Sequence, residues 1–162
     1  TPPQAPPRAP AELGKGGEAL HALQTGRAHS RAQRWPEAIE ALLASVSSNE
    51  TASARCEHGW AHYQAGTLAE ARAKLERGTQ LLRALATYRE RDRNTLGACL
   101  YNLGRVLEAS DPAGAAAAYR ESVEVRPNEV AAARLASLDL PPPEVEATCD
   151  PVPYPPLLPP AT

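Results

Sequence analysis

The stretch from Gly59 to Gly78, GWAHYQAGTLAEARAKLERG, most constrains how this chain can fold. Small residues recur in both halves of the stretch, at intervals that let two helix backbones approach closely. Gly66 separates the halves, and Thr67 and Glu70 have the spacing of a capping box at the start of a new helix. The stretch therefore predicts an antiparallel helix pair, which cannot bury its own apolar face and needs further pairs beside it.

The same pattern occurs before and after this stretch. Gly26 precedes Gly59 by 33 residues, and Gly104 follows it by 45. Leu42 stands in the first copy where Leu75 stands in the central one. The longer second interval predicts a longer second helix in the central pair and a longer first helix in the pair that follows.

The prolines are distributed as stacked helix pairs require. Residues 1–10 hold five prolines and residues 139–162 hold nine, whereas residues 11–138 hold three, at expected helix starts or repeat ends: Pro36, Pro112 and Pro127. Proline is tolerated at a helix start because the missing N–H has no partner there. We therefore expect a helical domain between a Pro-rich N-terminal arm and a Pro-rich acidic C-terminal tail, both extended.

These copies resemble the tetratricopeptide repeat, a helix–turn–helix unit of about 34 residues. The resemblance covers about three repeats over residues 18–138. It is closest in the third, where Leu103, Gly104 and Leu107 follow the family's L-G-x-x-Y pattern with leucine in place of the aromatic residue. The resemblance implies an all-α solenoid of antiparallel helix pairs, closed by a capping helix over residues 128–138.

In this family the first helices of the pairs line a concave groove that binds extended peptides. The resemblance places the following residues in such a groove: Arg27, Arg31, Trp60, Tyr63, Gln64, Asn102 and Arg105. For Trp60 and Tyr63 the alternative is packing between neighbouring pairs. Some family members hold the C-terminal carboxylate of a peptide with lysine and asparagine; here only Asn102 fits, and Glu57 would repel a carboxylate.

The resemblance implies a non-enzymatic scaffold or accessory subunit that contacts protein partners in a larger assembly, without a cofactor. A net charge of −2 gives no reason to expect nucleic acid, and no apolar run is long enough to span a membrane. Two alternatives come from other classes. One is a thiol-redox or metal-responsive protein, and the other is a purely structural subunit assembled through its Pro-rich arms.

The three cysteines have no Cys-x-x-Cys spacing and so no zinc-site pattern. In an exported protein they allow one disulfide. We favour Cys56–Cys149, because the tail is expected to be the most mobile segment, with Cys56–Cys99 as the second choice. The absence of Met fits removal of a signal peptide, so we expect export to a bacterial envelope (periplasmic) or beyond. A cytoplasmic protein with three reduced thiols is the alternative.

His58 and His62 are four residues apart, so they share a helix face and form the alternative metal site. They stand at the Leu and Tyr places of the family pattern, which pack inside a helix pair. We therefore expect packing rather than metal binding.

The tail carries a charge of −4, which leaves +2 on the 138 residues before it. Tyr154, Leu157 and Leu158 are apolar side chains that a purely solvating tail does not need. The tail is either a linker or a segment that contacts the groove of its own chain or of a neighbour. The arginines expected in the groove and an aromatic wall for the prolines motivate the second possibility.

Overall fold

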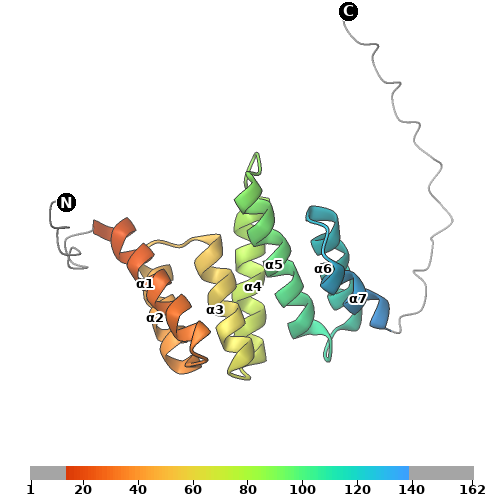
Figure 1. Ribbon diagram of the computed structural model, residues 1–162, viewed down its shortest axis with the longest axis horizontal. Coiled ribbons are helices and arrows are strands. Elements are labelled where there is room, and N and C mark those ends of the chain that lie inside the picture. The colour runs from red at the N-terminus through yellow and green to blue at the C-terminus, as the bar shows by residue number, and fades with distance from the viewer. Residues whose placement is uncertain (1–13, 139–162) are drawn as a thin grey trace, which may run out of the picture.

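The computed structural model describes residues 14–138, which form seven α-helices and no strand (Figure 1). The helices are α1 (Gly14–Arg31), α2 (Trp35–Ser48), α3 (Ala52–Gln64), α4 (Leu68–Arg83), α5 (Glu90–Leu107), α6 (Pro112–Val125) and α7 (Glu129–Ser137). The first six form three pairs, α1 with α2, α3 with α4 and α5 with α6, and the pairs stand side by side along the long axis of the molecule (Figure 1). The predicted all-α solenoid is confirmed. Residues 1–13 and 139–162, which include both Pro-rich segments, lie outside the described residues.

A close contact at a glycine holds each pair together. In each pair a glycine of the first helix faces a large side chain of the second: Gly26 with Leu42, Gly59 with Leu75, and Gly104 with Tyr119. A Cβ atom at any of these glycines would lie 2.5–2.6 Å from that side chain, closer than atoms pack. The three large side chains are fully buried. The register that the sequence predicts for the three repeats is therefore confirmed.

The helix starts predicted from proline are confirmed, since Pro36 and Pro112 stand in the first turns of α2 and α6. Two further starts are capped by side chains: Thr51 accepts a hydrogen bond from the Ala54 N–H at 3.2 Å, and Asp111 accepts one from the Gly114 N–H at 3.0 Å. These side chains satisfy donors that a helix start leaves unpaired.

The capping box predicted before α4 is wrong. Thr67 precedes the helix, but its Oγ1 donates to the His62 carbonyl at 3.1 Å and lies 2.8 Å from His62 Nδ1. Glu70 accepts a hydrogen bond from Lys74 at 2.9 Å instead of bonding the Thr67 N–H. Thr67 and Glu70 thus bond to His62 and Lys74 instead of to each other's backbone, which the spacing pattern alone cannot show.

The 45-residue interval is accommodated by a long second helix in the central pair and a long first helix in the pair that follows, as predicted. Helix α4 has 16 residues and α5 has 18, whereas α3 has 13 and α6 has 14. Helices α4 and α5 are not one continuous helix, because residues 84–89 form the connection between them. The end of α4 and the start of α5 thus extend the stack beside the start of α3.

Helix α7 covers the far end of the stack, as predicted. Asn128 accepts hydrogen bonds from the N–H groups of Val130 and Ala131, and Ala131 is fully buried against α6. Arg134 donates to Glu108 at 3.0 Å, which joins α7 to the end of α5. None of the seven described helices combines the length and apolar character needed to cross a membrane.

Gly104→Ala should lower the free energy of unfolding by about 1–3 kcal/mol, because a methyl group would overlap the buried Tyr119 ring. Gly16→Ala is the matched control, since a Cβ there meets nothing within 4 Å. That change should instead raise stability by about 0.5–1 kcal/mol through helix propensity. Chemical denaturation measures both variants, and equal effects would contradict the close packing of α5 on α6.

Candidate binding groove

Helices α1, α3 and α5 line a hollow in the stack. A cavity of about 680 Å³ lies between α1, the start of α3, the end of α4 and the start of α5. A second cavity of about 300 Å³ lies between α3 and α5, with Arg27 of α1 at its edge. Arg27, Ser53 and Thr95 border both cavities, so the two form one continuous groove.

The larger cavity lies where the end of α4 and the start of α5 extend past the start of α3. Its leucine side chains come from α1, from the last turn of α4 and from the connection that follows it: Leu23, Leu81, Leu82 and Leu85. Arg91 and Asp92, from the first turn of α5, supply polar groups. Sequence reasoning missed this cavity, although the long interval between Gly59 and Gly104, together with three leucines near the end of α4, was a usable signal.

Besides Arg27, two more of the residues predicted for the groove line the smaller cavity. Trp60 of α3 and Asn102 of α5 line it, and Trp60 is half-buried. Three residues of α5 that were not predicted line it as well: Asn94, Thr95 and Ala98. They precede Asn102 at helical spacing and so continue its face of α5 toward the start of the helix.

Arg27 borders the groove, but its charge is matched. Its Nε donates to Glu57 Oε1 at 2.7 Å, and this hydrogen bond raises the pKa of the guanidinium above its usual value. Arg27 therefore does not offer an unpaired positive charge to a ligand. The sequence gives no sign of the pairing, because Glu57 lies on the neighbouring helix α3.

Tyr63 and Arg105 lie together in a cluster with Trp60 and Tyr101, which we call the aromatic–arginine cluster. The Trp60 and Tyr63 rings stack with their centres 5.1 Å apart. The Arg105 guanidinium lies 5.7 Å from the centre of the Tyr63 ring. It donates to the hydroxyl oxygens of Tyr63 at 3.3 Å and Tyr101 at 3.4 Å. The cluster thus joins α3 to α5 and adjoins the smaller cavity through Trp60.

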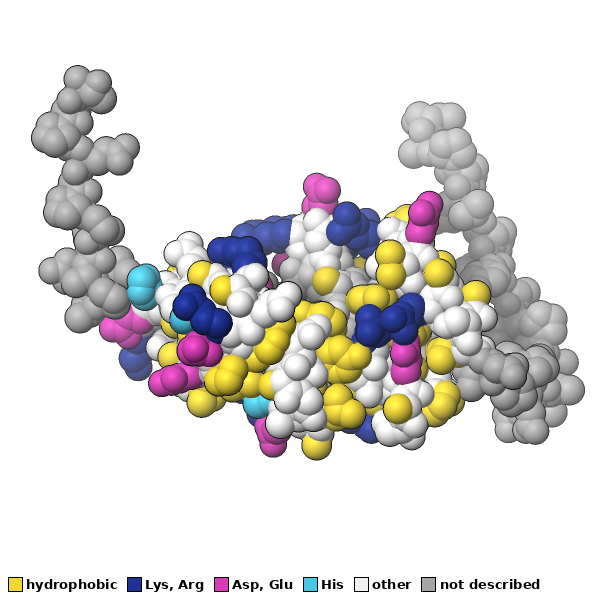
Figure 2. Space-filling view, turned by 60° about the horizontal axis from the view of Figure 1, so that its bottom comes forward, with side chains coloured by type: hydrophobic (Ala, Val, Ile, Leu, Met, Phe, Trp, Pro, Cys, Tyr) yellow, Lys and Arg dark blue, Asp and Glu magenta, His cyan; other side chains and the backbone are white. Residues whose placement is uncertain are grey.

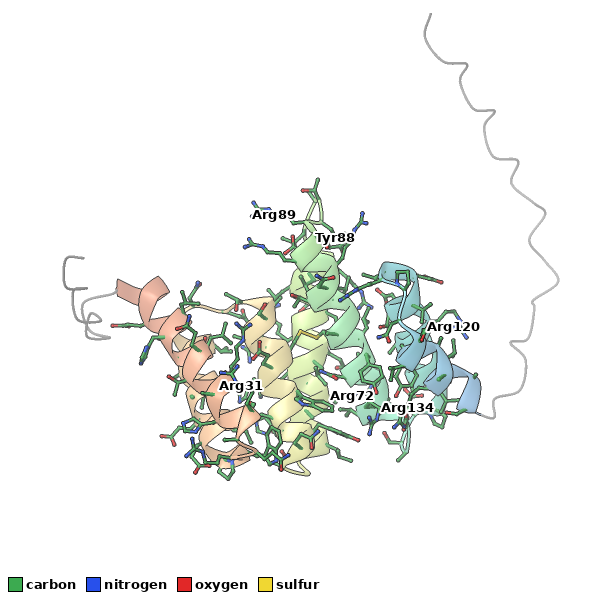
Figure 3. All side chains as sticks on the ribbon, in the orientation of Figure 1. Arg31, Arg72, Tyr88, Arg89, Arg120 and Arg134 are labelled. Atoms are coloured by element: carbon green, nitrogen blue, oxygen red, sulfur yellow. A yellow bond between two sulfur atoms is a disulfide. The ribbon has the colours of Figure 1, made fainter. Side chains whose placement is uncertain are left out.

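Tyr63 and Arg105 themselves border neither cavity, and the remaining two predicted groove residues do not either. Arg31 is exposed at the last residue of α1 (Figure 3), and Gln64 is exposed at the last residue of α3. The repeat pattern assigns them to the correct helices, but they lie at the helix ends.

Cys56 and Cys99 form a disulfide that joins α3 to α5, with their Cα atoms 5.4 Å apart. The first-choice pairing, Cys56–Cys149, is therefore corrected: Cys56 is already bonded, and Cys149 lies outside the described residues. The expected mobility of the tail was a poor guide, because helix packing alone brings Cys99 beside Cys56. Gly78 of α4 makes room for the bond, since a Cβ there would lie 2.5 Å from Cys56 Sγ. Both cysteines are buried, which disfavours thiol exchange at this bond.

His58 and His62 contact each other inside the central pair, with their Nε2 atoms 3.2 Å apart. His58 is only 1% exposed, which agrees with the predicted packing role. Burial, and next the proximity of His62, lower the pKa of His58 to about 4. Among residues 14–138, no group of three or more His, Cys, Asp or Glu side chains is placed to hold a metal ion.

Acidification should destabilise the protein through His58. The unfolded side chain binds a proton near pH 6.5 and the folded one only near pH 4, so stability is full above pH 6.5 and falls between these values. The loss should reach about 3 kcal/mol near pH 4. Burial lowers the pKa of His62 as well, which acts in the same direction. Nearby Lys74 and Arg55 also lower the pKa of His58, and Glu70 opposes them.

The test compares denaturation at pH 7 and pH 4.5 in two variants. His58→Leu should remove most of the pH dependence, whereas His21→Leu, at an exposed position of α1, should leave it in place. An unchanged pH dependence in His58→Leu would contradict the assignment.

Comparison with models of protein families and with curated proteins finds no match for this sequence. Similar solved structures include the tetratricopeptide-repeat domain of Arabidopsis OM64, which matches with a TM-score of 0.67 at 16% sequence identity. The match covers 78% of this chain and 98% of that domain. At this level of identity the likeness concerns the arrangement of the backbone. Three helix pairs in the predicted register, a capping helix and this likeness together show that the chain has the tetratricopeptide-repeat fold.

Proposed function

We propose that this protein is a non-enzymatic interaction module whose groove binds an extended segment of a partner protein. It would act as a scaffold or as an accessory subunit of a larger assembly. The observation that carries the proposal is the continuous groove across α1, α3 and α5, formed by two adjoining cavities. A groove open along several helices suits a ligand that lies across the stack, whereas a compact small molecule prefers an enclosed pocket.

The chemistry of the groove supports a peptide-like ligand. Ser53, Asn94 and Asn102 offer hydrogen-bonding groups to a peptide backbone, and Trp60 and the leucines of the larger cavity offer apolar contact. Glu50, at the edge of the larger cavity, is bound by Arg77 and Arg55, which lower the pKa of its carboxyl group to about 2. On the face drawn in Figure 2, basic side chains likewise stand next to acidic ones, with hydrophobic side chains between these groups.

The position of the perturbed titratable groups supports a non-enzymatic role. Catalytic acids and bases with displaced pKa values usually stand in a cleft. Here His58 is buried between α3 and α4 and borders neither cavity of the groove. Glu50 borders the larger cavity, but it is paired with Arg55 and Arg77, and its lowered pKa makes its carboxylate a weak base.

We also propose that the protein works in an oxidising compartment, as a periplasmic or extracellular component. The buried Cys56–Cys99 disulfide supports this, because such bonds form and persist mainly outside reducing compartments.

The groove is tested by selecting, from a displayed library of random linear peptides, those that bind the full chain. Trp60→Ala should weaken the selected peptides about tenfold or more, as removal of a central aromatic contact does. Asn102→Leu, which keeps the side-chain size, should also weaken them. Arg120→Gln is the control, because Arg120 is exposed on α6 and lies outside both cavities (Figure 3). Failure to select any peptide, or equal binding to all three variants and the parent, would overturn the proposal.

The disulfide and the compartment are tested on protein purified from its native source. After unfolding without a reductant and alkylation, intact mass should show one modified thiol, that of Cys149, because Cys56 and Cys99 are bonded to each other. After reduction, all three cysteines should be modified. Three modified thiols without reduction would contradict both the bond and the oxidising compartment.

A further inference from the structure

The positive charge of Arg105 is unmatched within the described part of the chain. Arg105 is the one partly buried lysine or arginine among residues 14–138 that has no carboxylate within 4.0 Å. Its Nε is buried without a hydrogen-bond partner. The guanidinium contacts two tyrosine hydroxyls at 3.3 and 3.4 Å, which are neutral acceptors. A partly buried cation of this kind is stabilised by an anionic neighbour.

The neighbours of Arg105 are aromatic rings. Tyr63 lies under the guanidinium and stacks on Trp60, which is half-buried and borders the smaller cavity. Aromatic surfaces of this kind bind proline rings of extended segments, because a Pro-rich segment is already extended and loses little entropy on docking. The aromatic–arginine cluster is therefore suited to a Pro-rich segment that carries carboxylates.

Residues 139–162 are such a segment. They hold nine prolines and no basic residue, and their four carboxylates come from Asp139, Glu144, Glu146 and Asp150. The described residues carry a net charge of +2, so the segment and the helical domain are of opposite sign.

The segment also begins close to the cluster. Arg134 of α7 is bonded to Glu108, one turn after Arg105 on α5. Leu138, the last described residue, packs against the same buried core as Tyr63 and Tyr101. An extended chain covers about 3.3 Å per residue, so Glu144 can lie up to roughly 20 Å from Leu138. Glu108 lies three residues from Arg105, and Arg134 lies four residues from Leu138, so each is about one helical turn away. This length of chain is therefore enough for the first carboxylates of the segment to approach Arg105 in the same molecule.

We propose that residues 139–162 fold back onto the aromatic–arginine cluster of their own chain, with a carboxylate beside Arg105 and prolines on Trp60 and Tyr63. The segment covers the end of the groove at the smaller cavity and competes there with a partner segment. This regulatory consequence rests on the proposed function of the groove, whereas the intramolecular contact itself does not.

Trp60 provides a direct readout, since the chain has two tryptophans and Trp35 packs against a separate part of the core. In a Trp35→Phe background, fluorescence reports Trp60 alone. Acrylamide quenching then compares the full chain with a full chain in which the four tail carboxylates are neutralised (D139N, E144Q, E146Q and D150N). Neutralisation removes the ion pair with Arg105, so the segment should leave Trp60 exposed for more of the time, and the quenching constant of Trp60 should rise about twofold.

Arg105→Gln should raise the quenching constant similarly, and Arg120→Gln should not change it. The tail variant is decisive, because it leaves every described side chain in place. An unchanged quenching constant in that variant would overturn the fold-back. So would a quenching constant that depends on protein concentration, since this would assign the contact to the tail of a second copy. The peptide selection measures ligand binding and does not depend on the quenching of Trp60. Failure of the fold-back and failure of the proposed function can therefore be told apart.

Discussion

The close contact between a glycine and a large side chain in each pair sets the geometry on which the rest of the structure depends. Because Gly26, Gly59 and Gly104 carry no Cβ, the two helix backbones of each pair approach closely, and the side chain opposite fills the space. This contact recurs at the same place in all three pairs, so the first helices stand on one side of the stack. The groove between α1, α3 and α5 is thus a direct consequence of how the pairs close.

A glycine also permits the one covalent link between two first helices in the described chain. Gly78 of α4 leaves room for Cys56 and Cys99 to meet, so the disulfide holds α3 against α5 where the smaller cavity lies. Closing a loop with a sequence separation of 43 residues restricts the unfolded chain, by about 4 kcal/mol in the loop-closure description. The same bond therefore stabilises the stack and fixes the width of the groove.

The sequence predicts the contacts within a repeat better than those between repeats. The glycine register, Pro36 at the start of α2 and Pro112 at the start of α6 are local signals, and all are confirmed. The pairing of Arg27 with Glu57 and of Cys56 with Cys99 depends on how neighbouring pairs are rotated against each other, which no local pattern specifies. The groove residues are assigned to the correct helices, but only some of them lie at the cavities, because position along a helix also matters.

Electrostatics then distinguish the two ends of the groove. Arg27 is matched by Glu57 in the middle, and Arg91 stands beside Asp92 at the larger cavity, whose apolar wall is formed mainly by leucines. Only at the aromatic–arginine cluster does a partly buried positive charge remain unmatched within the described residues. Under the proposed function, a bound segment would place apolar side chains in the larger cavity and an acidic or Pro-rich portion at Arg105. The groove would thereby select the direction in which the segment runs, because reversing it would set a carboxylate against leucines and leave Arg105 unpaired.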